Sequence, residues 1–494
     1  MSGILLVLIF PRFNFEILAW LAFIPLFSAI ESKTPQLAAL SGFITGMVFY
    51  TSGLSWINNT LINYGNLPQV VSFLVLGLLS AYLSLYTALF CYLITMVCKN
   101  NKGVYFLFAP ALWTALEYIR STHSEYGFSW LGLGYSQFQS LPVIQMAEYT
   151  GVYGVSWLIM LVNVGFYLTW KSWNGRPDTN MGVRFLSVTI LVLALWVGYG
   201  SLALNRTVKA PSLKVALIQG NVEQAMKWNP VYQKLVMSKY KNLTLKAAQS
   251  KPQLIVWPET ATPFFYNQHE AGTQFVNDLA RQTKTPILFG SPYRENTTHY
   301  NSAYLVSETG DTQGRYNKIH LVPFGEFVPF RKLLFFVEKM VAMIGDFGRG
   351  KVATLFDVAG YKAGVSICYE MIFPDLMRQA VKNGAHFLVN ITNDAWFSKS
   401  AASYQHMSMG ALRAVENRVP IVRAANTGIS GTITANGALQ YETDLFVEAA
   451  QITKITPRQG GLTFYSSYGD VFSWLCLLAT GLITLTARRN IKGI

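Results

Sequence analysis

The sequence predicts a polytopic α-helical membrane domain joined to a layered α/β domain. Only 13% of the 494 residues are charged, against about 25% in soluble domains, and the mean hydropathy is +0.29. Long apolar runs fill residues 1–204 and return near the C-terminus, whereas residues 205–467 are polar and mixed. We therefore expect membrane helices at 1–204, an extracytoplasmic domain at 205–467, and a last membrane helix with a basic cytoplasmic tail at 468–494.

About seven segments of the first domain are long enough, or nearly so, to cross a hydrocarbon core of about 30 Å. They lie near residues 2–10, 15–31, 36–57, 69–97, 104–120, 151–172 and 183–201, and one more apolar run covers 470–487. The first is too short to span unaided, so whether residues 2–10 fully cross the membrane stays open. The N-terminus shows no cleavable signal pattern.

Basic residues predict the orientation of these helices. They gather in alternate loops and in the tail, at Lys33, Lys99, Lys102, Lys171, Arg176, Arg184, Arg488, Arg489 and Lys492. The intervening loops at 58–68 and 121–150 contain neither Lys nor Arg. Because Lys and Arg concentrate in cytoplasmic loops, residues 205–467 should lie outside, on the side of the membrane away from the cytoplasm.

Strands alternate with helices in the outer domain. Val-, Ile- and Leu-rich runs typical of strands covered on both faces occur at 214–220, 253–259, 286–292, 302–308, 363–369, 385–392 and 420–427. Helical patterns cover 231–249 and 403–418, for example. This alternation predicts an α/β layered domain.

Several function classes are disfavoured by what the sequence lacks. The net charge of +14 is not gathered in a dense basic stripe interleaved with aromatics, so we expect no nucleic-acid partner. Neither HxxxH nor CxxC spacing occurs, and GxGxxG and P-loop motifs are absent. We therefore expect no metal and no cofactor.

Cys368 is the only cysteine of the outer domain, and it follows a predicted strand. Glu259 follows another strand, and Lys318 follows the Tyr-Asn of a third motif. Side chains at strand ends of an α/β sheet share one crevice. There a thiol could attack a carbonyl, a carboxylate could move the proton, and an ammonium could stabilise the oxyanion and favour the thiolate.

Each of these residues has a plainer interpretation. A glutamate after a strand is commonly a surface or capping residue, a lone lysine is usually solvated, and a cysteine in an apolar strand is usually a small buried hydrophobe. The order and spacing of the motifs are specific where the single residues are not. The motifs are WPETATP (257–263), YNKIHLVPFGEFVPF (316–330), ICYEMIFPD (367–375), NITNDAWF (390–397) and RAANTGISG (423–431).

These motifs resemble the nitrilase (carbon-nitrogen hydrolase) superfamily, and the flanking membrane helices resemble its apolipoprotein N-acyltransferase family. The resemblance covers essentially the whole chain and implies an αββα sandwich in the outer domain. It implies a triad of Glu259 as general base, Lys318 as oxyanion stabiliser and Cys368 as nucleophile. It also implies supporting roles for Glu326, Tyr369 and Glu370.

The resemblance further implies a ping-pong reaction. Cys368 would take a fatty acyl group from a membrane phospholipid as a thioester and pass it to the N-terminal amine of a diacylated apolipoprotein. We expect a monomer. Preferred head group, acyl length and acceptors are not readable from the sequence.

Other residues are candidates for binding the acyl chains. Residues 327–347 carry an unusual load of apolar side chains, which favours either a core helix or an arm that touches the bilayer. Our substrate-binding candidates are Trp228, Phe264, Phe330 and Phe335. His406, Asn393, Asp394, Arg413, Glu416 and Arg423 are expected to be structural.

Two alternatives remain. One is a membrane-tethered nitrilase or amidase that hydrolyses small C–N substrates. The other is a transporter or scaffold with an inactive outer domain, which should carry buried ionisable residues in its helices. Glu117 and Glu148 are the notable candidates for such residues.

Overall fold

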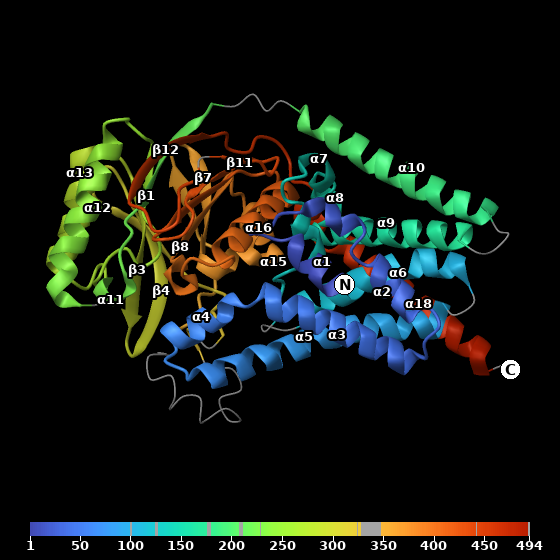
Figure 1. Cartoon of the computed structure of the whole chain (residues 1–494). Coiled ribbons are helices and arrows are strands. Elements are labelled where there is room, and N and C mark those ends of the chain that lie inside the picture. Colours follow the sequence, from blue (N-terminus) through green and yellow to red (C-terminus); the bar gives the residue numbers. More distant parts are fainter. Residues whose placement is uncertain are drawn as a thin grey trace. The chain divides into compact units, whose positions relative to one another are not determined.

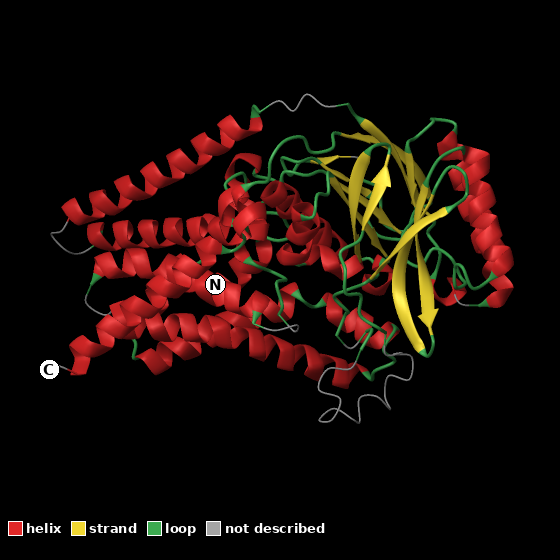
Figure 2. Cartoon of the chain, turned by 180° about the vertical axis from the view of Figure 1, so that it is seen from behind, coloured by secondary structure: helices red, strands yellow, loops and turns green. Residues whose placement is uncertain are grey.

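The computed structural model describes residues 1–98, 101–123, 127–174, 179–206, 211–227, 229–323, 325–327, 347–440 and 442–492. The chain forms two compact units. One contains residues 1–62, 67–206 and 468–494, and the other contains residues 63–66 and 207–467. Figure 2 shows that the described strands all belong to the second unit.

The first unit is helical. Its helices, including two 3₁₀ segments (η1 and η2), are α1 (Ser2–Leu8), η1 (Glu16–Trp20), α2 (Ile24–Ile30), α3 (Pro35–Gly53), α4 (Trp56–Asn63), α5 (Gln69–Cys98), α6 (Lys102–Thr122), η2 (Leu133–Gln137), α7 (Leu141–Ile144), α8 (Ala147–Thr150), α9 (Val152–Trp173), α10 (Thr179–Leu204) and α18 (Val471–Lys492). Within the described residues, α5, α9 and α10 are long and apolar enough to cross a membrane. The pair α3 and α4, bent by 54°, makes a fourth span if it crosses as one.

This number is lower than the seven predicted segments. The predicted helix at 15–31 is broken into η1 and α2, each too short to span. The segment at 104–120 does form the continuous helix α6. However, α6 includes Lys102, Glu117 and Arg120, and it lacks the hydropathy of a span.

The second unit is built on two six-stranded sheets (Figure 1). The first has the order β12-β1-β2-β3-β4-β5 and the second β11-β10-β9-β8-β7-β6. The strands are β1 (Leu213–Gln219), β2 (Leu254–Val256), β3 (Ile287–Glu295), β4 (Thr298–Val306), β5 (Thr312–Asn317), β6 (Leu355–Val358), β7 (Tyr361–Ile367), β8 (Phe387–Thr392), β9 (Ile421–Ala425), β10 (Gly431–Ile433), β11 (Leu439–Gln440) and β12 (Ala449–Ile455).

The central strands of each sheet are parallel and the outer ones antiparallel. β1, β2 and β3 run parallel, as do β7, β8 and β9. Their pairing is set by apolar residues, for example Val215 opposite Leu254 and Val365 opposite Val389. The parallel strands therefore end at a common edge, where following residues can meet.

The main core lies between the two sheets. Side chains from β1, β2 and β3 and from β7, β8 and β9 form one buried cluster, in which Leu217, Val256, Ile367 and Val389 are typical. The other face of the first sheet packs on α12 (Gln233–Ala248) and α13 (Glu270–Thr283). These layers match the predicted αββα sandwich.

The outer face of the second sheet is covered by α15 (Pro374–Lys382) and α16 (Ala402–Asn417). The unit's remaining short helices are α11 (Gln224–Lys227), η3 (Pro230–Tyr232), η4 (Cys368–Ile372), η5 (Asp394–Phe397) and α17 (Phe464–Tyr468). All seven predicted strands are present, with ends shifted by a few residues. The two predicted helices are also confirmed as α12 and α16.

Candidate active site

Cys368 lies directly after β7, as the first residue of η4, and is only 7% exposed. Its φ of 55° falls in the left-handed region, which disfavours a residue with a Cβ by about 1–3 kcal/mol. Such strain persists only where neighbouring groups hold the backbone. Neighbouring groups must therefore hold the backbone in this sharp turn from strand to helix.

Two buried side chains hold the carbonyl of Cys368. Asn390 Nδ2 and His406 Nε2 each lie 3.2 Å from this oxygen. Arg423 Nη2 lies 3.0 Å from His406 Nδ1. Because a guanidinium only donates, Nδ1 accepts, so the proton of the neutral ring sits on Nε2 and is donated to Cys368. The contact of His406 Nδ1 with Arg423 is shorter than its contact with Asp394 Oδ1, which measures 3.4 Å.

Glu259 follows β2 after Trp257 and Pro258 and is 6% exposed. Its Oε1 accepts a hydrogen bond of 2.6 Å from Asn301 Nδ2, a residue of β4. Its Oε2 is buried and has no hydrogen-bond partner within the described residues. A buried carboxylate oxygen without a donor is costly for a purely structural group, and it leaves a position ready to accept a proton.

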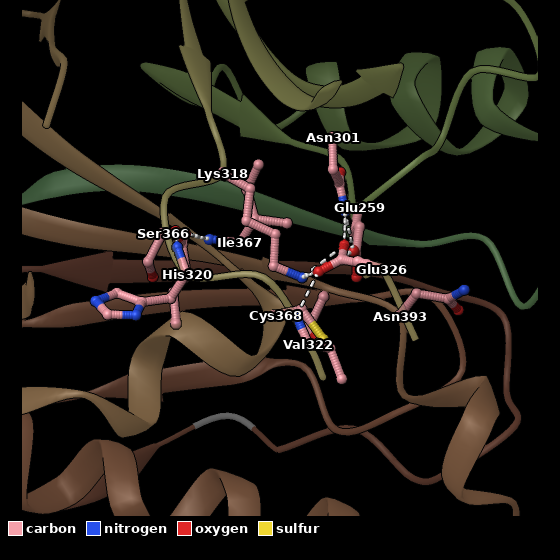
Figure 3. Close-up of polar contacts among 12 residues, drawn as sticks. Glu259, Asn301, Lys318, His320, Val322, Glu326, Ser366, Ile367, Cys368 and Asn393 are labelled. Atoms are coloured by element: carbon pink, nitrogen blue, oxygen red, sulfur yellow. Dashed lines mark hydrogen bonds and ion pairs between the residues drawn. The ribbon is translucent and has the colours of Figure 1, made fainter. Parts of the chain in front are cut away.

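Lys318 is the residue after β5 and is 1% exposed. Its Nζ lies 2.9 Å from both carboxylate oxygens of Glu326 and 4.0 Å from Glu259 Oε1. Figure 3 shows these three side chains pointing toward one another, with the Cys368 sulfur beside them. Burial disfavours the ammonium, but the charges of Glu326 and Glu259 outweigh it and raise the pKa of Lys318 above its ordinary value.

Glu326 is fixed from two further directions. The backbone N–H of Val322 donates to its Oε2 at 2.8 Å, and Asn301 Nδ2 donates to its Oε1 at 3.0 Å. Asn301 thus bridges the two carboxylates that flank Lys318 (Figure 3). Our reading of the sequence missed Asn301, because an asparagine within a strand gives no signal of its own.

Glu370 joins the segments that carry Cys368 and Lys318. Its carboxylate accepts from the backbone N–H of Ile367 at 2.6 Å and of Ile319 at 2.6 Å, and from the Tyr316 hydroxyl at 2.8 Å. Burial raises the pKa of Glu370 to about 7, although these backbone hydrogen bonds oppose the shift. Glu370 therefore supports the site by binding the backbone next to Cys368 and the backbone next to Lys318.

Tyr369, the other predicted supporting residue, is half-buried. Its ring packs edge-on against Phe373 with the ring centroids 4.9 Å apart. It also packs against the core between the sheets. Burial raises the pKa of the Tyr369 hydroxyl, so it stays protonated at neutral pH.

The thiol of Cys368 is protonated at rest. Burial and the charge of Glu259 raise its pKa to about 12, although Lys318 acts in the opposite direction. The expectation that Lys318 favours the thiolate is right in sign. It does not produce a standing thiolate, because desolvation of the sulfur is the larger effect. An attack by this sulfur on a carbonyl would therefore require removal of its proton at the same time.

Of the four predicted substrate-binding residues, only Phe264 lies within the described residues. Trp228, Phe330 and Phe335 lie outside the described residues, as do residues 328–346 of the expected arm. Phe264 is 6% exposed and belongs to the core between the first sheet and its helices. There it stacks on His269, which corrects its assignment to an acyl-chain entrance.

Lys227 is a buried residue of the QGN-to-Lys-Trp motif (219–228), to which we assigned no role from the sequence. It ends α11, is 2% exposed, and its Nζ donates to the backbone oxygen of Glu259 at 3.0 Å. Among the described residues, no group of three or more His, Cys, Asp and Glu side chains could hold a metal ion. The arrangement of carboxylate, ammonium and thiol is suited to acyl transfer through a covalent intermediate.

Comparisons with known proteins identify the relatives of this chain. The family model for the apolipoprotein N-acyltransferase N-terminal domain matches residues 2–165, and that for carbon-nitrogen hydrolase matches residues 214–460. An apolipoprotein N-acyltransferase of Geobacter metallireducens is 43% identical over 99% of this chain and 94% of its own length. One from Methylococcus capsulatus is 34% identical over 99% and 95%. Saccharomyces cerevisiae Nit3, of the nitrilase superfamily, is 20% identical, covers 53% of this chain and 94% of its own, and has a TM-score of 0.40.

Proposed function

The chain belongs to the apolipoprotein N-acyltransferase family, and we propose that it completes lipoprotein maturation by a two-step acyl transfer through Cys368. A fatty acyl chain passes from a membrane phospholipid to the cysteine sulfur. It then passes to the N-terminal amine of the diacylglyceryl-cysteine of an apolipoprotein. The observation that carries the proposal is the burial of Glu259, Lys318 and Cys368 together at neighbouring strand ends.

In the first step the Cys368 sulfur attacks the ester carbonyl of the phospholipid. Glu259 takes the thiol proton, for which its Oε2 has no competing donor in the described chain. Lys318, held by Glu326, faces the negative charge that develops on the carbonyl oxygen. The carbon–oxygen bond breaks, the proton passes from Glu259 to the leaving alkoxide, and a lysophospholipid departs.

In the second step the neutral α-amine of the acceptor attacks the thioester. Glu259 now takes a proton from the attacking nitrogen, and Lys318 again faces the oxyanion. The carbon–sulfur bond breaks and Glu259 returns the proton to sulfur. The thiol pKa of about 12 favours this direction, because the buried sulfur leaves as a thiol rather than as a standing thiolate.

The membrane setting supports a lipid donor. Three or four described helices are long and apolar enough to span a bilayer. We place the chain in the bacterial inner membrane as a monomer, with the sandwich on the periplasmic side, on the strength of the basic loops. A membrane-tethered nitrilase or amidase would share the triad. The family relationship of the N-terminal 165 residues favours acyl transfer over it.

Mass spectrometry of the full-length protein tests both steps. After incubation with phospholipid, an acyl adduct should appear on Cys368, and it should disappear when a diacylated lipopeptide is added. Hydrolysis of a small soluble amide without such an adduct would support the amidase instead.

Two substitutions serve as controls. Cys368→Ala should abolish the adduct and the transfer. Cys368→Ser should nearly abolish them, because a serine hydroxyl is a far weaker nucleophile than a thiolate. Full activity of Cys368→Ala on purified substrates would refute the assignment.

A further inference from the structure

Lys227 lies at the site without a role in the mechanism above. It is almost completely buried, and its ammonium donates to the main-chain oxygen of Glu259 at 3.0 Å. Burying a lysine is unfavourable unless nearby charges and dipoles compensate. The compensating groups here are the carboxylate charge of Glu259 and its main-chain oxygen, which accepts the hydrogen bond.

The balance of charge around Cys368 shows what this ammonium adds. The described carboxylates are Glu259, Glu326, Asp394 and, behind Tyr316, Glu370; the described cations are Lys318, Arg423 and Lys227. His406, which contacts the Cys368 carbonyl, is neutral, because burial and Arg423 lower its pKa. Tyr369 is also neutral at working pH because burial raises its pKa.

Without Lys227 the negative groups dominate. The charge of Arg423 is paired with that of Asp394 at 2.8 Å, and the charge of Lys318 is paired with that of Glu326 at 2.9 Å. Among the described residues, the charge of Glu259 is then balanced only by the ammonium of Lys318, 4.0 Å away. Uncompensated, this carboxylate opposes ionisation of the neighbouring thiol.

We propose that Lys227 is a positioning residue and the second cation of the site. Its ammonium fixes the main chain of Glu259 and offsets the carboxylate charge, so that Cys368 gives up its proton more readily than it otherwise would. The inference deepens the proposed function, since it takes Cys368 to be the nucleophile.

The proposed role requires the ammonium to be charged at neutral pH. Burial lowers the pKa of Lys227 to about 8, while the charge of Glu259 opposes that shift. Lys227 therefore keeps most of its charge near pH 7 and loses it in the mildly alkaline range.

Alkylation of Cys368 by iodoacetamide measures this effect directly. The rate is followed by mass spectrometry of the Cys368 peptide in the full-length protein, from neutral to alkaline pH. Two variants separate charge from hydrogen bonding: Lys227→Met removes both, and Lys227→Gln keeps a donor but no charge. Lys239→Met is the matched control, because Lys239 pairs with Glu448 at a half-exposed position.

We expect both Lys227 variants to alkylate about tenfold more slowly than the wild type at neutral pH. The difference should shrink above about pH 8, where Lys227 itself loses its charge. Lys239→Met should keep the wild-type profile. An unchanged rate at neutral pH in both Lys227 variants would overturn the proposal, and so would a wild-type rate in Lys227→Gln alone. If Lys227→Met fails to fold, Lys227→Gln carries the test.

The experiment does not depend on the acyl donor. Slower alkylation at neutral pH supports the role of Lys227 even if no acyl adduct forms. An adduct on Cys368 combined with an unchanged rate would leave the proposed function standing and remove Lys227 from it.

Discussion

Two buried charged clusters in the sandwich unit differ in how completely their polar atoms are paired. The anchor cluster contains Asp394, Arg423, His406 and Asn390 on the second sheet and α16. The site cluster contains Glu259, Lys318, Glu326 and Asn301 at the edge of the first sheet. The residues of both clusters are at most 12% exposed.

The anchor cluster is saturated where it meets Arg423. The three guanidinium nitrogens donate to Ile429 O, to Asn390 Oδ1 and to Asp394 Oδ2. Asp394 Oδ1 accepts from Thr392 at 2.9 Å. Burial opposes the charge of Asp394, but the charge of Arg423 and the hydrogen bond from Thr392 hold its pKa below the ordinary value. Saturated buried networks of this kind make a structure rigid.

The site cluster instead keeps one carboxylate oxygen, Glu259 Oε2, without a hydrogen bond among the described residues. This difference indicates which of the two buried ionic networks has an atom available for a reaction. The fully paired cluster holds the Cys368 backbone, and in the proposed mechanism the incompletely paired cluster supplies the base.

The largest effect is expected for Glu259→Gln. The amide keeps an oxygen for the Asn301 hydrogen bond but cannot take a proton, so acyl transfer should fall by about 10²–10⁴-fold. The measurement is the rate of acylation of a diacylated lipopeptide. The thermal unfolding temperature should change little, and a large fall in that temperature with normal transfer would reverse the roles assigned to the two clusters.

For the anchor cluster, Asp394→Asn should act on stability first. It leaves the buried Arg423 guanidinium without its carboxylate, which costs about 3–5 kcal/mol. The readout is thermal unfolding of the full-length protein. Asp278→Asn breaks an exposed pair with Arg281 and is the control, expected to stay within about 1 kcal/mol of wild type. Equal effects of the two variants would show that the anchor cluster does not stabilise the fold.

Glu370 should give the fold a smaller, pH-dependent contribution. Its pKa is raised from 4.5 to about 7, so between these values the native chain binds more protons than the unfolded one. Stability associated with Glu370 is then present below about pH 4.5 and falls by about 3 kcal/mol as the pH rises to about 7.

The comparison of wild type with Glu370→Gln across this range isolates that contribution. His406, whose pKa is lowered by burial, contributes in the opposite direction, but it does so in both proteins. The difference in unfolding temperature should therefore move in favour of Glu370→Gln as the pH rises. A constant difference would contradict the raised pKa.

Much of the sandwich follows from apolar runs. The seven predicted strands include all the parallel ones, since these are buried on both faces and rich in Val, Ile and Leu. The strands that were missed are β5, β6, β10, β11 and β12. β5 reads TQGRYN and β10 has three residues. Polar or very short strands have no periodicity to detect, and only a neighbouring strand defines them.

The membrane helices show the same limit. Continuous apolar runs correctly placed α5, α9 and α10, but the run at 15–31 breaks into η1 and α2. Hydropathy indicates which side chains are apolar. It does not indicate where the backbone hydrogen bonds of a helix are interrupted.

The sequence by itself determined the family, the αββα class and the order of Glu259, Lys318 and Cys368 along the chain, because short motifs and apolar periodicity are local properties. Only the tertiary structure decided which groups surround them. Asn301, Lys227 and Asn390 reach the site from separate elements, and the resting protonation of Cys368 depends on burial and on Glu259. Desolvation and Coulomb interactions depend on distance in space, which the order of residues does not record.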